Sequence, residues 1–297
     1  MAQERRAHEY FLEVGPDLDS VIEEAGKRIG LPLDRRVSPI RTWLPVVDKM
    51  TLGFTPGKLY VCGGRPGDGK TSFATTIAAN IMRESNQSIL FISTELTPLE
   101  LVLQAGEAYC GGIETAPKMG ELTQNDKDRL KASHEAIQES IVMGRLSILH
   151  AKKLSEKMLQ DAIRHHCRVL NDDKISLVIV DQMNRIARSD KDKHGYAIAT
   201  EHLLNTLEEV ASDHHVPLLL VTQLNRGAEM QQKPTMGNIK HSGALEEYAH
   251  CVFLLHRGEG SDAEIIIAKN RDGACGPVPA RFYGASHTWA EWEEAHG

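Results

Sequence analysis

From residue 57 onward, short runs of apolar residues alternate with longer stretches in which apolar residues recur at helical spacing. The runs predict buried strands and the longer stretches predict amphipathic helices. The predicted strands are 58–63, 88–93, 176–181 and 216–223; the predicted helices are 70–85, a helix that begins at Pro98, 155–170 and 199–212. Continuously apolar strands separated by helices are typical of a parallel sheet covered on both faces. The sequence therefore predicts an α/β fold.

Three further apolar runs follow near the C-terminus without long helices between them, at 250–257, 263–270 and 278–284. We expect them to extend one edge of the sheet, partly in the antiparallel sense.

The first 40 residues are polar and charged, apart from a set of apolar residues at helical spacing: Leu18, Val21, Ile22, Ala25 and Ile29. This spacing predicts a short amphipathic helix that has to bury its apolar stripe against something. We therefore expect two parts, an N-terminal arm over 1–40 and a core domain over 41–297.

The composition of the 297 residues is that of an ordinary globular protein, with 41% hydrophobic and 25% charged residues. No apolar run approaches the roughly 18–20 residues that span a bilayer, so we expect no membrane association. The five scattered cysteines indicate free thiols in a reducing cytoplasm. A net charge of −7 argues against a generally basic nucleic-acid coat, but it leaves room for a narrow basic channel.

The segment "GRPGDGKT" (64–71) matches the phosphate-binding pattern G-x-x-x-x-G-K-[ST], with a predicted strand before it and a helix after it. Its glycines allow backbone N–H groups to cradle phosphates, Lys70 would reach the β- and γ-phosphates, and Thr71 would hold Mg²⁺. The predicted ATP site consists of Gly64, Arg65, Pro66, Gly67, Asp68, Gly69, Lys70, Thr71 and Ser72. The alternative is a glycine-rich turn without a ligand.

Three polar residues stand at the carboxyl ends of predicted strands, where open α/β sheets bind ligands. Asp181 is the candidate carboxylate for the metal, although an aspartate that ends a strand is also common in turns. Glu95 is the candidate general base, whereas Glu100 fits a capping box with Thr97 at the start of a helix. Gln223 has a neutral amide that can hydrogen-bond the γ-phosphate or the attacking water.

The stretch after Gln223 is polar and is expected to form a long loop. It is locally basic, and its glycines permit close approach to a nucleic-acid backbone. The candidate DNA contacts are Arg226, Lys240, His241 and Gly243. A solvated loop without a ligand is an equally good interpretation.

The stretch "IIIAKNRDG" (265–273) ends a buried strand in two cations, Lys269 and Arg271. Cations at the tip of a core strand are costly unless something anionic meets them. The phosphate loop already serves this chain's own nucleotide, so the pair is predicted to complete the site of another subunit in trans. That arrangement implies head-to-tail contacts in a ring or filament. A solvated strand end is the alternative.

In order, the motifs resemble those of the RecA-like motor domain of DnaB-type replicative helicases over about residues 40–285. The matching segments are "TPGKLYVCGGRPGDGKTSFA", "FISTELT", "LVIVDQMNRI", "VPLLLVTQLNRG", "KPTMGNIKHSGALEEYAHCVFLLHR" and "IIIAKNRDGACGPVPARF". The resemblance implies a RecA-like P-loop NTPase core, a hexameric ring, and ATP- and Mg²⁺-dependent movement 5′ to 3′ along single-stranded DNA. It also implies a primase or helicase loader as partner, in a bacterial or phage-infected cell.

The resemblance assigns the same roles to the residues discussed above. It makes Glu95 the catalytic glutamate, Gln223 the sensor, and Lys269 with Arg271 the finger that acts in trans. The channel loop of the family corresponds to Lys240, His241, Ser242 and Gly243.

The sequence departs from the family's pattern in several places. Only about 40 residues precede the core, so we expect the family's helical N-terminal domain to be absent. His241 replaces the usual acidic residue of the channel loop, and His250 stands in "EEYAH" where an acid is expected. The pair after the magnesium strand reads Asp181–Gln182. These differences indicate a divergent member.

Two other functions remain open. One is a RecA-, RadA- or KaiC-like oligomeric ATPase that assembles without unwinding DNA. The other is a binding module with residual nucleotide affinity, which Glu95, Asp181 and Gln223 disfavour.

Overall fold

The computed structural model describes residues 39–111, 122–169, 175–186, 195–225, 233–239 and 242–292. The chain divides into two compact units, Met1–Ser38 and Pro39–Gly297. All of the first unit lies outside the described residues, and with it the predicted helix of the arm. Every described residue belongs to the second unit.

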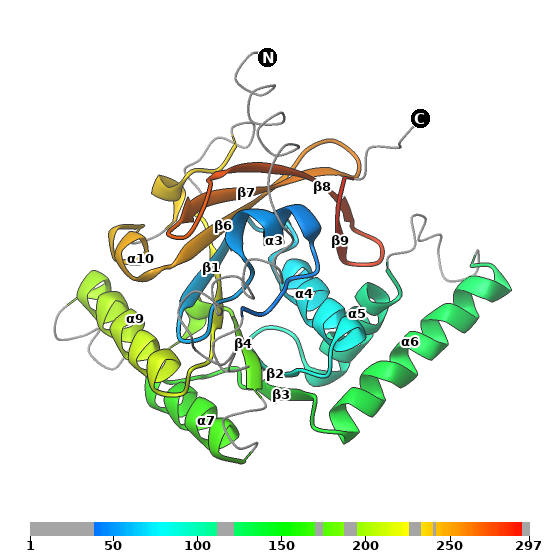
Figure 1. Cartoon of the computed structure of the whole chain (residues 1–297), viewed down its shortest axis with the longest axis horizontal. Coiled ribbons are helices and arrows are strands. Elements are labelled where there is room, and N and C mark those ends of the chain that lie inside the picture. Colours follow the sequence, from blue (N-terminus) through cyan, green and yellow to red (C-terminus); the bar gives the residue numbers. More distant parts are fainter. Residues whose placement is uncertain are drawn as a thin grey trace, which may run out of the picture. The chain divides into compact units, whose positions relative to one another are not determined.

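One mixed sheet forms the centre of the described part (Figure 1). Its strands are β1 (Leu59–Gly64), β2 (Ser88–Ser93), β3 (Leu146–His150), β4 (Ile175–Asp181), β5 (Leu218–Gln223), β6 (Cys251–Arg257), β7 (Asp262–Asn270), β8 (Gly276–Tyr283) and β9 (Thr288–Glu291). They lie in the order β3-β2-β4-β5-β1-β6-β7-β8-β9. The strands from β3 to β6 pair in parallel, whereas β6 to β9 pair antiparallel.

Helices cover both faces of this sheet. They are α3 (Pro45–Thr51), α4 (Lys70–Glu84), α5 (Pro98–Tyr109), α6 (Gln124–Val142), α7 (Glu156–Val169), α9 (Tyr196–Asp213) and α10 (Ser242–Tyr248), with two short 3₁₀ helices, η2 (Met183–Arg185) and η3 (Met236–Asn238). One face packs on α7, α9 and α10, and α4 to α6 lie together on the other (Figure 1). Alternate residues of each central strand therefore enter two different apolar cores.

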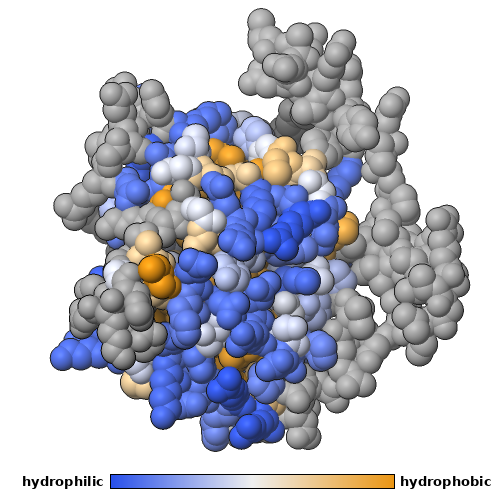
Figure 2. All heavy atoms as spheres, turned by 90° about the vertical axis from the view of Figure 1, so that its left-hand side faces the viewer, coloured by the Kyte–Doolittle hydropathy of each residue, from blue (hydrophilic) through white to orange (hydrophobic). Residues whose placement is uncertain are grey.

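The outer surface over α7, α9 and α10 is mainly hydrophilic, with small separate hydrophobic patches (Figure 2). On these helices Met158 and Ile198 are exposed, while Leu203, Leu204 and Leu207 are fully buried. That division is what an amphipathic helix against a sheet produces. No helix in the described ranges is both long enough and apolar enough to cross a membrane.

The α/β fold with a mostly parallel sheet is confirmed, and the predicted strands and helices lie within a few residues of their observed bounds. The long loop predicted after Gln223 is wrong in part, because some of its described residues form regular structure, whereas Asn225 and residues 233–235 do not. Leu224 forms a β-bridge with Ile239, η3 precedes that bridge, and α10 begins at Ser242. Three apolar side chains of this stretch, on Leu224, Ile239 and Leu245, are buried in the core, which accounts for the regular structure around them.

Candidate functional site

The phosphate loop lies between the end of β1 and the start of α4, as the sequence predicted. Gly67 and Gly69 have φ of 86° and 76°, values that glycine adopts without strain. At Gly69 a Cβ atom would come within 2.8 Å of the Phe282 ring. The Trp289 indole donates a hydrogen bond to the Gly69 carbonyl at 2.9 Å. The loop is thus supported from behind by side chains of β8 and β9.

Charged side chains hold the phosphate loop in place through hydrogen bonds to its backbone. Lys70 is only 7% exposed as a residue, and its ammonium donates to the Arg65 carbonyl at 2.8 Å. Asp68 accepts a hydrogen bond from the Arg65 N–H at 2.8 Å, and burial raises the pKa of its carboxyl. Arg257 donates to the Gly67 carbonyl at 2.9 Å. A nearly buried lysine at the end of a glycine-rich loop, before the N-terminus of a helix, provides the setting that an anionic ligand requires.

Asp181 and Thr71 form the metal side of the site. The Thr71 hydroxyl donates to Asp181 Oδ2 at 2.8 Å, and Asp181 is completely buried. Burial raises the pKa of Asp181 to about 6, although the Thr71 hydrogen bond acts in the opposite direction. Within the described part of the chain, Asp181 Oδ1 is buried without a hydrogen-bond partner. An unpartnered carboxylate oxygen beside a hydroxyl matches the oxygen ligands that Mg²⁺ prefers.

Glu95 lies at the same end of the parallel strands, two residues beyond the pair that Ser93 forms with Asp181. The Glu95 side chain is 29% exposed, and its Oε1 lies 2.6 Å from Nη2 of Arg185. Sequence reasoning missed Arg185, although its place four residues after Asp181 was a usable signal. Glu100 forms the predicted capping box with Thr97, which confirms a structural role.

Gln223 ends β5 directly beside the phosphate loop. It is the register partner of Gly64, and the N–H of Leu224 donates to the Gly64 carbonyl at 3.1 Å. Asn184, which the sequence analysis also missed, accepts from the Thr222 hydroxyl at 3.0 Å and donates to the Gln223 carbonyl at 3.4 Å. The structure thus brings five predicted site residues together at the carboxyl ends of the parallel strands: Lys70, Thr71, Glu95, Asp181 and Gln223.

Lys269 and Arg271 lie elsewhere, at the end of the sheet where the parallel strands begin. Lys269 pairs with Val252 near the start of β6, and the start of β6 pairs with Tyr60 near the start of β1. From Tyr60 to the phosphate loop at Gly64, the strand spans roughly 13 Å at about 3.3 Å per residue. The two cations therefore do not join the phosphate loop of their own chain.

Backbone carbonyls at the C-terminal end of α10 meet these cations within the chain. Lys269 donates to the carbonyls of Glu246 and Ala249, the latter at 2.5 Å, and Arg271 donates to the carbonyl of Glu247. The negative end of a helix suits cations. Arg271 is nevertheless exposed.

Of the candidate DNA contacts, Arg226, Lys240 and His241 lie outside the described residues. Gly243 is exposed in the first turn of α10 and therefore belongs to a helix, not to a loop.

The family model for the DnaB-like helicase C terminal domain matches residues 39–291. The chain belongs to this family. Among curated relatives of the DnaB-like chain, the replicative DNA helicase DnaC of Bacillus subtilis is 28% identical over 261 residues, covering 83% of this chain. The replicative DNA helicase DnaB of Geobacillus stearothermophilus is 29% identical and covers 84% of it. The chain spans about half the length of these two relatives, 55% and 56%.

Solved structures agree on the DnaB-like fold. One solved ATPase domain superposes with a TM-score of 0.76 at 21% identity and covers 94% of this chain and 100% of its own. A DnaB-like replicative helicase, described with its interactions with primase, gives a TM-score of 0.76 at 20% identity. It covers 95% of this chain and 68% of its own. A KaiC-like protein of Pyrococcus horikoshii reaches a TM-score of 0.59. The RecA-like core is therefore confirmed.

Proposed function

We propose that this chain is the ATP-hydrolysing motor of a DnaB-type helicase that works as a ring of copies on single-stranded DNA, moving 5′ to 3′. One observation carries the proposal beyond family membership. The nucleotide-binding groups lie where the parallel strands end, whereas the Lys269–Arg271 pair lies where those strands begin.

The nucleotide is held by the backbone and side chains of the phosphate loop. Its residues are Gly64, Arg65, Pro66, Gly67, Asp68, Gly69, Lys70, Thr71 and Ser72. Thr71 and Asp181 hold Mg²⁺, which supplies charge neutralisation for the phosphates when bound. The unpartnered Oδ1 of Asp181 supports this assignment.

Hydrolysis requires a group that orients and deprotonates water. Glu95 fills that role because it lies at the same end of the parallel strands as Asp181 and its side chain is partly open to solvent. Gln223, beside Gly64, holds the water or the γ-phosphate with its amide and reports the loss of that phosphate to the residues after β5.

Lys269 and Arg271 complete the nucleotide site of the next copy. A cation that reaches the phosphates from a neighbour stabilises charge in the transition state, and such a contribution is large. A protomer with the phosphate loop at one end of its strands and the cation pair at the other makes head-to-tail contacts with its neighbours. Such contacts close into a ring when the rotation between successive copies permits. We propose a hexamer on the strength of the family.

Single-stranded DNA contacts Arg226, Lys240, His241 and Gly243, and this assignment rests on the sequence. A primase or helicase loader is the further partner that we propose, supported by the solved relative described with its interactions with primase.

The test is ATP turnover with and without single-stranded DNA, followed by unwinding of forked duplexes with one or the other tail blocked. We expect DNA-stimulated turnover and unwinding only when the 5′ tail is free. DNA-stimulated turnover without any strand separation would favour the RecA-, RadA- or KaiC-like alternative. Nucleotide binding without turnover under any condition would leave a binding module.

A further inference from the structure

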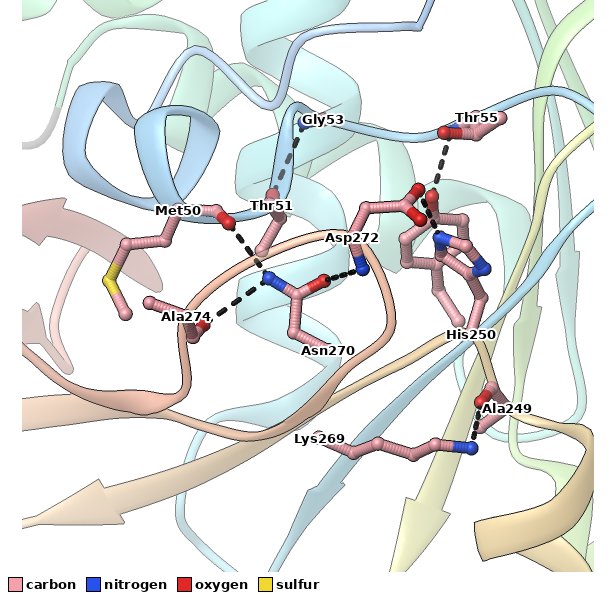
Figure 3. A network of polar contacts seen from close by, with 11 residues as sticks. Met50, Thr51, Gly53, Thr55, Ala249, His250, Lys269, Asn270, Asp272 and Ala274 are labelled. Atoms are coloured by element: carbon pink, nitrogen blue, oxygen red, sulfur yellow. Dashed lines mark hydrogen bonds and ion pairs between the residues drawn. The ribbon is translucent and has the colours of Figure 1, made fainter. Parts of the chain in front are cut away.

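The turn after β7 is fastened to the body of the domain by contacts that the nucleotide site does not use (Figure 3). The amide of Asn270 donates to the carbonyl of Met50 at 2.7 Å and to that of Ala274 at 3.2 Å. Its oxygen accepts from the N–H of Asp272 at 3.2 Å. At Gly273 a Cβ atom would lie 2.3 Å from the Met50 carbonyl oxygen, so the turn lies tightly against the end of α3.

His250 is the buried anchor of this turn. Its Nε2 lies 2.7 Å from Oδ2 of Asp272, and its side chain is 8% exposed against 43% for Asp272. An ionised carboxylate only accepts, so Nε2–H donates this bond. The backbone of His250 is fixed as well, because its N–H donates to the Leu59 carbonyl at 2.7 Å and its own carbonyl accepts from the Arg271 N–H at 3.1 Å.

A second ring holds the imidazole in place from the side of β1. The centroid of the Tyr60 ring lies 5.7 Å from that of His250, and the Tyr60 hydroxyl accepts from the N–H of Thr55 at 2.7 Å. Tyr60 is fully buried. The position of the imidazole is therefore set by the core, whereas residues 271–275 above it are exposed.

We propose that His250 and Asp272 are positioning residues for the cation pair, and that their hydrogen bond holds the exposed turn so that Lys269 and Arg271 reach a neighbour's nucleotide. The inference rests on the proposed function. The two cations flank Asn270, and Arg271 immediately precedes Asp272. Loss of the His250–Asp272 bond would leave the turn held less firmly by the core beside Arg271, although its other contacts remain. Misplacement of the guanidinium by about 1 Å can cost 10²-fold in rate.

Substitutions at the two positions separate the hydrogen bond from the fold. We expect His250→Ala and Asp272→Ala to lower the kcat of the assembled protein by about ten- to a hundredfold. Affinity for ATP and the size of the assembly should stay close to those of the unsubstituted chain. Asp272 is on the exposed turn, so its variant tests the idea even if His250→Ala folds poorly. His250→Gln should keep most of the activity, since its amide N–H can take the place of Nε2–H.

Mixed assemblies show whether the effect is in trans. A Lys70→Ala chain lacks its own nucleotide site but carries an intact cation pair. Mixed with excess Lys70→Ala chain, the His250→Ala and Asp272→Ala chains should regain turnover, because their nucleotide sites then face an intact pair. The control is His202→Ala, which removes a different histidine–carboxylate contact, 3.2 Å from Glu156 on another face, and should leave turnover unchanged.

An Arg271→Ala chain tests the proposed function separately. If mixing rescues Arg271→Ala but neither positioning variant, the positioning inference is wrong and the function stands. Full activity of both positioning variants would also overturn it. If Arg271→Ala alone keeps full turnover, the cation pair itself does not act in trans, and the proposed function fails at that point.

Discussion

Asp181 is a carboxyl group whose surroundings favour its neutral form in the folded chain. Burial raises its pKa to about 6, above the value of 3.8 expected for an exposed aspartate. The protonated form therefore stabilises the folded state, and this contribution is present below pH 4 and is lost as the pH rises through about 6. At neutral pH the chain folds around an ionised, partly unsatisfied carboxylate.

Asp181→Asn should consequently raise the free energy of unfolding of the nucleotide-free protein at pH 7, by about 3 kcal/mol at most. The gain should be close to zero below pH 4 and should grow as the pH approaches 6. Chemical denaturation of both chains across this pH range measures it. The same variant should lose Mg²⁺-dependent ATP turnover.

Asp48 provides the matched control for that experiment. Burial also raises its pKa to about 6, but its oxygens accept hydrogen bonds from the N–H and hydroxyl of Thr42 and from the N–H of Trp43. An amide cannot accept all of these, so Asp48→Asn should destabilise the chain at pH 7. Equal gains from both substitutions would contradict the explanation.

Arg185 competes for the carboxylate that we propose as the general base. Its guanidinium lies 2.6 Å from Glu95, and at 54% exposure such a pair contributes about 1 kcal/mol or less. Arg185→Leu should therefore raise DNA-free ATP turnover by about fivefold at most. Lys131→Leu, which removes the Lys131–Glu135 pair on α6, should have no effect. Unchanged or lower turnover in Arg185→Leu would mean that the pair does not restrain Glu95.

Among the elements, the antiparallel strands β8 and β9 form a wall behind the phosphate loop. Phe282 and Trp289 face Gly69, with Trp289 bonded to its carbonyl. Gly67 has a similar positive φ, but among the described residues no atom lies within 4 Å of where its Cβ would stand. A comparison of substitutions at these two glycines therefore separates the cost of backbone strain from the cost of overlap with the wall.

Gly67→Ala and Gly69→Ala should both lose about 1 kcal/mol of stability from the left-handed backbone. Gly69→Ala should lose a further 1–3 kcal/mol, roughly, because its methyl group overlaps the Phe282 ring. Thermal unfolding without nucleotide measures the difference. Equal losses would show that the wall yields freely and does not shape the loop.

Sequence patterns predicted those elements whose apolar residues form a continuous run or recur with a regular period. All residues of β2 are buried, and its bounds were predicted to the residue. Helix α6 was missed because it is mostly polar, with only Ser133, Ile137 and Ser140 buried. Edge strand β3 is mostly half-exposed and therefore has a weak strand pattern.

The candidate site divides in the same way. Residues in a local motif, such as Lys70 and Thr71, could be placed from the sequence because neighbours in the chain define their roles. The Arg185–Glu95 and His250–Asp272 contacts join residues that only the strand order brings together, 90 and 22 positions apart. The place of Arg185 shortly after Asp181 indicates the end of the strand at which it lies, but no pattern in the sequence encodes either contact.

At the scale of the whole molecule, the proposed function gives each chain two half-sites that it cannot join by itself. Turnover per chain should therefore fall by about 10³-fold or more when the protein is diluted until it dissociates, which is the range for loss of such a cation. Binding of ATP to the phosphate loop should persist. Parallel measurements of turnover, nucleotide binding and light scattering over a dilution series test this. Constant turnover per chain in a monodisperse monomer would contradict it.

In the proposed assembly, the separation of the phosphate loop from the cation pair also decides how many catalytic centres form. An open chain of copies always leaves one terminal loop without its cations and one terminal cation pair without a loop. Closure of the proposed ring adds the last centre, so a ring opened to admit a DNA strand should lack one catalytic centre, at its gap, until it closes.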